Sequence, residues 1–178
     1  EVLEQVGNMA DLEELIISGI SVTDSGLAHL TRCTRLEDLT LFACPITNRG
    51  LAELGKVLTL ERLYLHGAKV TTSGLKQLNG LTRLEWLHAS SVAPDEGPVD
   101  LSGLTNLRHL TLGAPYEGPR LRDGDLAFLK VLPQLEWLQV GLSFTDAGMA
   151  NIASLTRLER ITIGGEEVTD RGLAYLSA

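Results

Sequence analysis

The sequence predicts an α/β solenoid, a fold in which one short unit is repeated and stacked along the chain. Three observations lead to this prediction. A strand-like pattern, L-x-x-L-x-L, recurs seven times at a spacing close to 24 residues. A second pattern, V/I-T-D-x-G-L-x-x-L, follows most copies and has the spacing of a helix. An apolar residue also stands three positions before every strand pattern, which gives each unit a third row of core side chains.

The strand half of each unit has apolar residues at alternate positions, which predicts a short strand with one buried face. The first leucine of each copy is the anchor used to align the units. Successive anchors are 24, 24, 24, 23, 28 and 23 residues apart. They are Leu12, Leu36, Leu60, Leu84, Leu107, Leu135 and Leu158.

The helix half places Asp or Asn where the N-cap of a helix would accept hydrogen bonds from free backbone N–H groups. The predicted caps are Asp24, Asn48, Asp146 and Asp170. The apolar row before the anchors is predicted to close the core beneath the helices. Its members are Met9, Cys33, Val57, Leu81, Leu104, Leu132 and Leu155.

The two cysteines, Cys33 and Cys44, both fall at core positions of the repeat. We expect them to be buried, reduced thiols that pack as small apolar side chains. Free thiols are usual in reducing compartments, so a cytoplasmic location is predicted.

Two units break the pattern. Residues 90–100 contain two prolines in place of the helix start, which forbids a helix there. Residues 113–122 lengthen the next unit and account for the 28-residue spacing. Insertions in repeat proteins map to loops on one face, so these two loops are predicted to be neighbours. They are either tolerated extensions of surface loops or a pair that frames a binding site.

This arrangement of strand, turn, helix and turn resembles the leucine-rich repeat family over almost the whole chain. The resemblance implies a right-handed solenoid, with parallel strands on a concave face and helices on the convex face. One unit is similar to the cysteine-containing subtype found beside F-box domains; it contains Cys33-Thr34-Arg35-Leu36, Leu39, Leu41, Cys44, Ile46-Thr47 and Gly50-Leu51. The V-T-D-x-G-L units are similar to large bacterial arrays, which favours a bacterial origin.

Residues 1–178 are interpreted as a single leucine-rich-repeat domain of about seven units. Residues 1–11 are similar to the tail of a preceding unit, and the chain ends inside a predicted helix. Solenoids need polar capping units, and neither end has one. We therefore expect a fragment of a longer protein, or an assembly module that stacks through its ends. The F-box likeness leaves a further alternative, the substrate-receptor part of a ubiquitin ligase component.

Composition narrows the classes of partner. The formal net charge is −8 and there is no basic stripe, which argues against nucleic acid and against an anionic membrane surface. No run of about eighteen apolar residues is present, so no membrane span is expected. No cofactor is expected. The oligomeric state stays open.

Residues between the strand leucines point away from the core, and this outward surface holds both tryptophans and three of the four histidines. Large amphipathic side chains on a solvent-facing sheet are typical anchors of protein interfaces. The chain is therefore predicted to be a non-catalytic module that binds a protein partner on its concave face. The candidate binding residues are Phe42, Tyr64, His66, Trp86, His88, His109, Trp137 and Gln139, with Tyr116 from the second irregular loop.

Catalytic alternatives are weaker. The histidines His66, His88 and His109 step two residues along each successive strand, which places neighbours roughly 8 Å apart, too far for one zinc ion without rearrangement. A column of glutamates follows the anchors at regular spacing, and we interpret it as a solvated edge. Motifs of hydrolases, metalloproteases and phosphate-binding loops are absent from the sequence.

Overall fold

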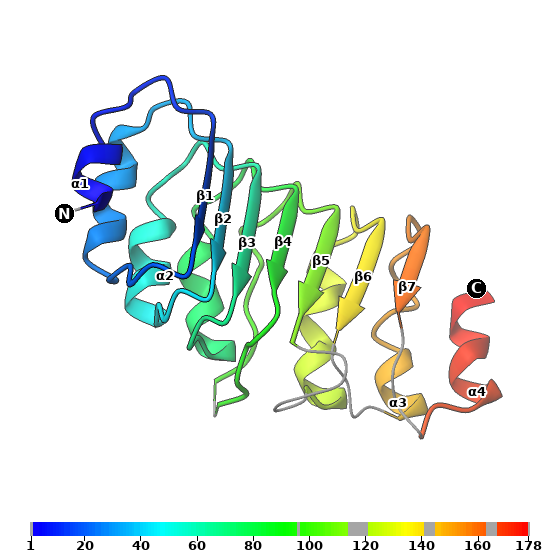
Figure 1. The fold of residues 1–178 in the computed structure, drawn as a ribbon. Helices are drawn as coiled ribbons and strands as arrows, with labels where there is room; N and C mark the ends of the chain where they lie inside the picture. Colours follow the sequence, from blue (N-terminus) through cyan, green and yellow to red (C-terminus); the bar gives the residue numbers. More distant parts are fainter. Residues whose placement is uncertain (1, 96, 114–120, 141–144, 163–166, 178) are drawn as a thin grey trace.

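Seven parallel strands form one continuous sheet in chain order in the computed structural model, which describes residues 2–95, 97–113, 121–140, 145–162 and 167–177 (Figure 1). The strands are β1 (Glu14–Ser18), β2 (Asp38–Phe42), β3 (Arg62–His66), β4 (Trp86–Ala89), β5 (His109–Leu112), β6 (Trp137–Val140) and β7 (Arg160–Thr162). The predicted α/β solenoid is confirmed.

The helical segments lie along one face of the sheet and leave the other, concave face open (Figure 1). Among the described residues, four segments are α-helical: α1 (Val2–Val6), α2 (Asn48–Leu54), α3 (Asp146–Met149) and α4 (Asp170–Leu173). Four are 3-10 helices: η1 (Gly26–Arg32), η2 (Thr72–Leu78), η3 (Asp123–Val131) and η4 (Ala174–Ser177). No helix among the described residues is long and apolar enough to cross a membrane.

The short, tight helical segments follow from the spacing of the units. Parallel strands are about 4.8 Å apart, whereas packed α-helices need about 8–10 Å between their axes. Slim 3-10 turns and brief α-helices reduce this crowding. The remaining difference in width bends the sheet toward its open face.

The core is a stack of leucine rows, and it agrees with the predicted columns. Every anchor from Leu36 to Leu135 is 0% exposed. Cys33 and Cys44 are buried free thiols, as predicted. The prediction is wrong for Met9, which is 55% exposed. Its equivalents in later units are covered by a unit on each side, and Met9 has such a neighbour on one side only.

The Asp and Asn residues that recur at the predicted cap positions do not cap their own helices, so that prediction is wrong. At Asn48, Asp146 and Asp170 the preceding threonine is the N-cap instead; Thr47 Oγ1, for example, accepts a hydrogen bond from the Arg49 N–H. In the first unit the N-cap is Ser25. The Asp24 carboxylate reaches the next unit, where it accepts hydrogen bonds from the Thr47 N–H (2.8 Å) and the Thr47 hydroxyl (2.6 Å). The same link between units joins Asn48 to Thr71, Asp123 to Thr145 and Asp146 to Thr169.

This link explains the glycine that stands three residues after the linked threonine, as Gly50 does after Thr47 and Gly74 after Thr71. A Cβ atom at Gly50 would lie 2.5 Å from Asp24 Oδ1, and one at Gly74 would lie 2.0 Å from Asn48 Oδ1. The glycines therefore leave room for the polar side chain of the preceding unit.

The first irregular loop reverses the direction of this link. Asp95 accepts hydrogen bonds from the Thr72 hydroxyl (2.6 Å) and the Ser73 hydroxyl (2.6 Å), both in the preceding unit. These bonds lower the pKa of the Asp95 carboxyl. Residues 90–95 and 97–100 contain no helix, as predicted, so the helical layer is interrupted between η2 and η3. Most of the second irregular loop, 114–120, lies outside the described residues, so its expected proximity to the first stays a prediction.

Replacing Asp24 by alanine tests the link between units. The Asp24→Ala variant leaves two partly buried donors of Thr47 without their acceptor. We expect the free energy of unfolding to fall by about 1–3 kcal/mol in urea titrations. Asp11→Ala is the matched control, because the Asp11 side chain is 93% exposed and only approaches Arg35 at 3.8 Å. Equal stability of the two variants would contradict the structural role of the link.

Candidate binding surface

The strand register brings the outward residues into the predicted columns. Pairing of β4, β5, β6 and β7 aligns Trp86 with His109, His109 with Trp137, and Trp137 with Arg160. Tyr64 is aligned with His88 in the second column, and Phe42 with His66 in the third. The concave face therefore presents these rings on neighbouring strands.

Seven rings form one surface, which we call the aromatic patch: Phe42, Tyr64, His66, Trp86, His88, His109 and Trp137. Trp86 stacks on His109 with ring centroids 4.1 Å apart and meets Trp137 edge-on at 5.3 Å. Tyr64 lies 6.0 Å from both Trp86 and His88. Phe42 stacks on His66 at 4.5 Å. The pairs are thus stacked, tilted or edge-on, and the edge-on contact of Trp86 with Trp137 is a geometry that aromatic pairs favour.

The patch is both accessible and rigid. Its rings are half-buried, except for Phe42 and His66, which are exposed. The Phe42 side chain is 47% exposed, which is unusual for an aromatic residue without a polar atom. The His66 ring is fixed by a hydrogen bond of 2.8 Å with the Ser90 hydroxyl. Side chains that are already ordered lose little conformational entropy when a partner binds.

Burial changes two ionisations within the patch. It raises the pKa of the Tyr64 hydroxyl. Burial, with a smaller contribution from the nearby His66 ring, lowers the pKa of His88. The His88 imidazole is therefore favoured in its neutral form at neutral pH.

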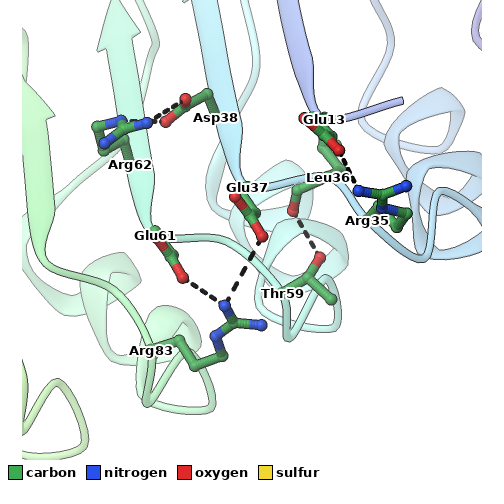
Figure 2. Close-up of polar contacts among 9 residues, drawn as sticks. All are labelled: Glu13, Arg35, Leu36, Glu37, Asp38, Thr59, Glu61, Arg62 and Arg83. Carbon is green, nitrogen blue, oxygen red and sulfur yellow. Dashed lines mark hydrogen bonds and ion pairs between the residues drawn. The ribbon is translucent and has the colours of Figure 1, made fainter. Parts of the chain in front are cut away.

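Ion pairs between units line the edge of the sheet where the strands begin. Arg35 pairs with Glu13, and Arg83 with Glu61 (Figure 2). Arg108 pairs with Glu136. Inside the first outward column, the Arg62 guanidinium donates two hydrogen bonds to the Asp38 carboxylate (Figure 2). The glutamate column is thus largely neutralised by arginines of neighbouring units, which supports its interpretation as a solvated edge.

A pocket of about 300 Å³ lies at one end of the patch. Its lining residues are Trp86, His109, Glu136, Trp137, Glu159 and Arg160. The Arg160 guanidinium stands over the Trp137 ring at 4.9 Å from the centroid, in cation–π geometry. The Trp137 Nε1 atom is buried, and no hydrogen-bond acceptor lies near it in the part of the chain that the structure describes.

The remaining candidates have a mixed outcome. Gln139 lies half-buried in the second column, beside Thr111 and Thr162. Tyr116 lies outside the described residues. His66, His88 and His109 fall in three different columns, and among the described residues no three His, Cys, Asp or Glu side chains are close enough to hold a metal ion.

Three residues of the pocket were not among the sequence candidates: Glu136, Glu159 and Arg160. The available signal was position: Arg160 follows Trp137 in the first outward column. A charged side chain next to a tryptophan in the same column suggests a contact that aromatic content alone does not identify.

No family model matches the sequence, and no curated protein matches it. The fold itself is similar to solved structures. An internalin (inlF) from Listeria monocytogenes superposes with a TM-score of 0.78 at 25% identity, over 98% of this chain and 48% of that one. An internalin C2 (inlC2) from the same species has a TM-score of 0.68 at 22% identity, over 96% of this chain and 80% of that one.

A plant receptor gives a more distant match. The Arabidopsis receptor kinase HAESA, solved in complex with the peptide hormone IDA and the co-receptor SERK1, has a TM-score of 0.64 at 23% identity, over 94% of this chain and 28% of that one. The fold is therefore a leucine-rich-repeat solenoid. The chain spans about half the length of the internalin inlF chain that it matches.

The lowered pKa of His88 can be tested by titration. We expect the His88 ring protons to titrate in NMR spectra below the ordinary value of 6.5. Since unfolded His88 then binds a proton at higher pH than the folded form does, acidification from about pH 7.5 to about pH 5.5 should reduce stability. His88→Gln should lose less stability over the same range. Titration of His88 at or above 6.5 would contradict this account.

Proposed function

We propose that the chain is a non-catalytic recognition domain that binds an extended peptide or protein segment across its concave face. One observation carries the proposal: the aromatic patch gathers seven rings on neighbouring strands, five of them linked by ring contacts and two, Phe42 and His66, stacked as a pair beside them.

The chemistry of the patch suits a protein ligand. Tryptophan and tyrosine provide large apolar area together with a polar atom, and they dominate the energetics of protein interfaces. The rings of Trp86, His109 and Trp137 support one another, so a partner meets a surface that is already in place. Rows of rings on successive strands fit a ligand that runs across the strands.

Known uses of the fold support this assignment. Leucine-rich-repeat domains are typically non-catalytic binding modules, and HAESA has been solved with a peptide hormone bound. We extend peptide recognition to this chain on the basis of its own patch. The cytoplasmic location and the bacterial origin stay predictions from the sequence.

The tryptophans offer a direct test, because the chain has no others and both belong to the patch. Peptides selected from a random library on the wild-type chain should change its tryptophan fluorescence. The double variant Trp86→Ala/Trp137→Ala should weaken their binding at least about 30-fold, as for the loss of one or two interface hot spots. Leu58→Ala removes a side chain that is 60% exposed and outside the patch, so it should leave affinity unchanged.

Circular dichroism of both variants separates lost binding from lost folding. Peptides that bind the folded double variant as tightly as wild type, without any change in wild-type fluorescence, would overturn the proposal.

End-to-end association is a second candidate, supported by the open side of the first unit. Met9 and Ile20 are 55% and 46% exposed, although Cys33 and Cys44, which follow them in the same columns, are each 1% exposed. A pocket of about 310 Å³ beside Ile20 and Val22 lies at this end. Another unit or another copy would cover these apolar surfaces.

Light scattering tests the association. If the ends stack, the average mass should rise with concentration, and Ile20→Arg should return the chain to a monomer. Asn106→Arg, which adds the same charge at an exposed site in a central unit, is the control. A constant monomer mass for the wild type at high concentration argues against stacking.

A further inference from the structure

We propose that the pocket at the Trp137 end of the aromatic patch binds the carboxylate of an acidic side chain on the partner segment. The inference rests on the proposed function and adds the chemical identity of one anchor. It concerns the three neighbours His109, Trp137 and Arg160, which stand side by side on β5, β6 and β7.

These three side chains supply hydrogen-bond donors that have no acceptor among the described residues. The Trp137 Nε1 atom is buried and has no partner there. The Arg160 guanidinium makes a cation–π contact with Trp137 but no hydrogen bond or ion pair with another described residue. The His109 ring contacts Trp86 and Trp137 and makes no hydrogen bond with a described residue. A buried donor without an acceptor is costly, and this applies to Trp137 Nε1. The exposed Arg160 guanidinium offers its donors directly to a ligand.

Arg160 differs in this respect from four arginines that lie on or just before the strands of preceding units. The guanidinium groups of these four are each engaged by a carboxylate of a neighbouring unit; the four are Arg35, Arg62, Arg83 and Arg108. Arg62 is the closest comparison, because it occupies the same outward column and is held by Asp38 on the adjacent strand. At Arg160 the corresponding neighbour is Trp137, which holds the guanidinium in place but accepts no hydrogen bond from it.

A carboxylate matches this set of donors. It carries two oxygens that can accept about four hydrogen bonds, and arginine binds it through two parallel N–H groups. The pocket volume of about 300 Å³ has room for an aspartate or glutamate side chain. An acidic side chain that projects from a segment lying across the rings can enter this pocket beside the exposed Arg160.

Two glutamates, Glu136 and Glu159, also line the pocket, and their charges affect how strongly it binds acidic or basic ligands. The charge of Glu136 is compensated by Arg108. The Glu159 side chain is exposed and makes no ion pair with the described residues. Its negative charge opposes an incoming carboxylate, so removing that charge should strengthen binding of an acidic ligand and weaken binding of a basic one.

NMR of the two indole N–H signals provides the test, with Trp86→Phe used to assign the signal of Trp137. The probe is a pentapeptide with one glutamate flanked by leucines, acetylated and amidated at its ends. Matched probes replace the glutamate by glutamine, by lysine, or by glutamine with a free terminal carboxylate. The glutamate probe should shift the Trp137 indole signal to saturation and bind about tenfold tighter than the glutamine probe.

Variants then assign the interaction. Arg160→Gln should abolish the preference for glutamate over glutamine, and Arg62→Gln should preserve it. Glu159→Gln should increase affinity for the glutamate probe. The inference is overturned if the glutamate and glutamine probes bind alike or not at all, if lysine binds best, or if the free terminal carboxylate equals the glutamate side chain. In each case the proposed function is judged separately, by whether library-selected peptides depend on Trp86 and Trp137.

Discussion

The spacing between parallel strands is the constraint on which the rest of the structure depends. Each unit advances by about 4.8 Å on the sheet side, so every element of the unit must fit that advance or bend the array. The helical segments are accordingly short and often of 3-10 type. Polar side chains form hydrogen bonds with the next unit, and the contact of Asp24 with Thr47 is the clearest instance. Gly50 and Gly74 leave space for that reach.

The same constraint explains why the fold was predictable from the sequence. Strands that pair in register at a nearly fixed period bring equivalent positions of successive units together. The burial of the anchor leucines and the order of the outward columns can therefore be predicted from the spacing of the repeats. Leu36 and Leu60 are therefore 0% exposed, and Trp86, His109 and Trp137 are adjacent. The role of Asp24 was not predictable in this way. Its position fits an N-cap within its own unit, and its actual partner, Thr47, becomes evident only when the units are stacked.

The candidate site was predictable in its aromatic members and incomplete in its polar ones. Ring residues in outward columns can be recognised from type and position alone. Arg160 stands out because no carboxylate pairs with its guanidinium among the described residues. That can be recognised only once the positions of all its neighbours are known. Met9 illustrates the same limit for burial, since its residue type and column predict a core position but its exposure depends on having a unit on one side only.

The interruption of the helical layer has a mechanical consequence. In a solenoid, each unit is stabilised mainly by contacts with the units before and after it. Between η2 and η3 the described chain provides strand pairing through β4 and the reversed Asp95 contacts, but no helix between them. The helical layer is therefore divided into two stretches, which are joined here by the sheet and the leucine core and not by a helix. Trp86 and His88 lie on β4, where the two stretches meet, so a ligand that spans the patch from Tyr64 to Trp137 would connect both stretches across the concave face.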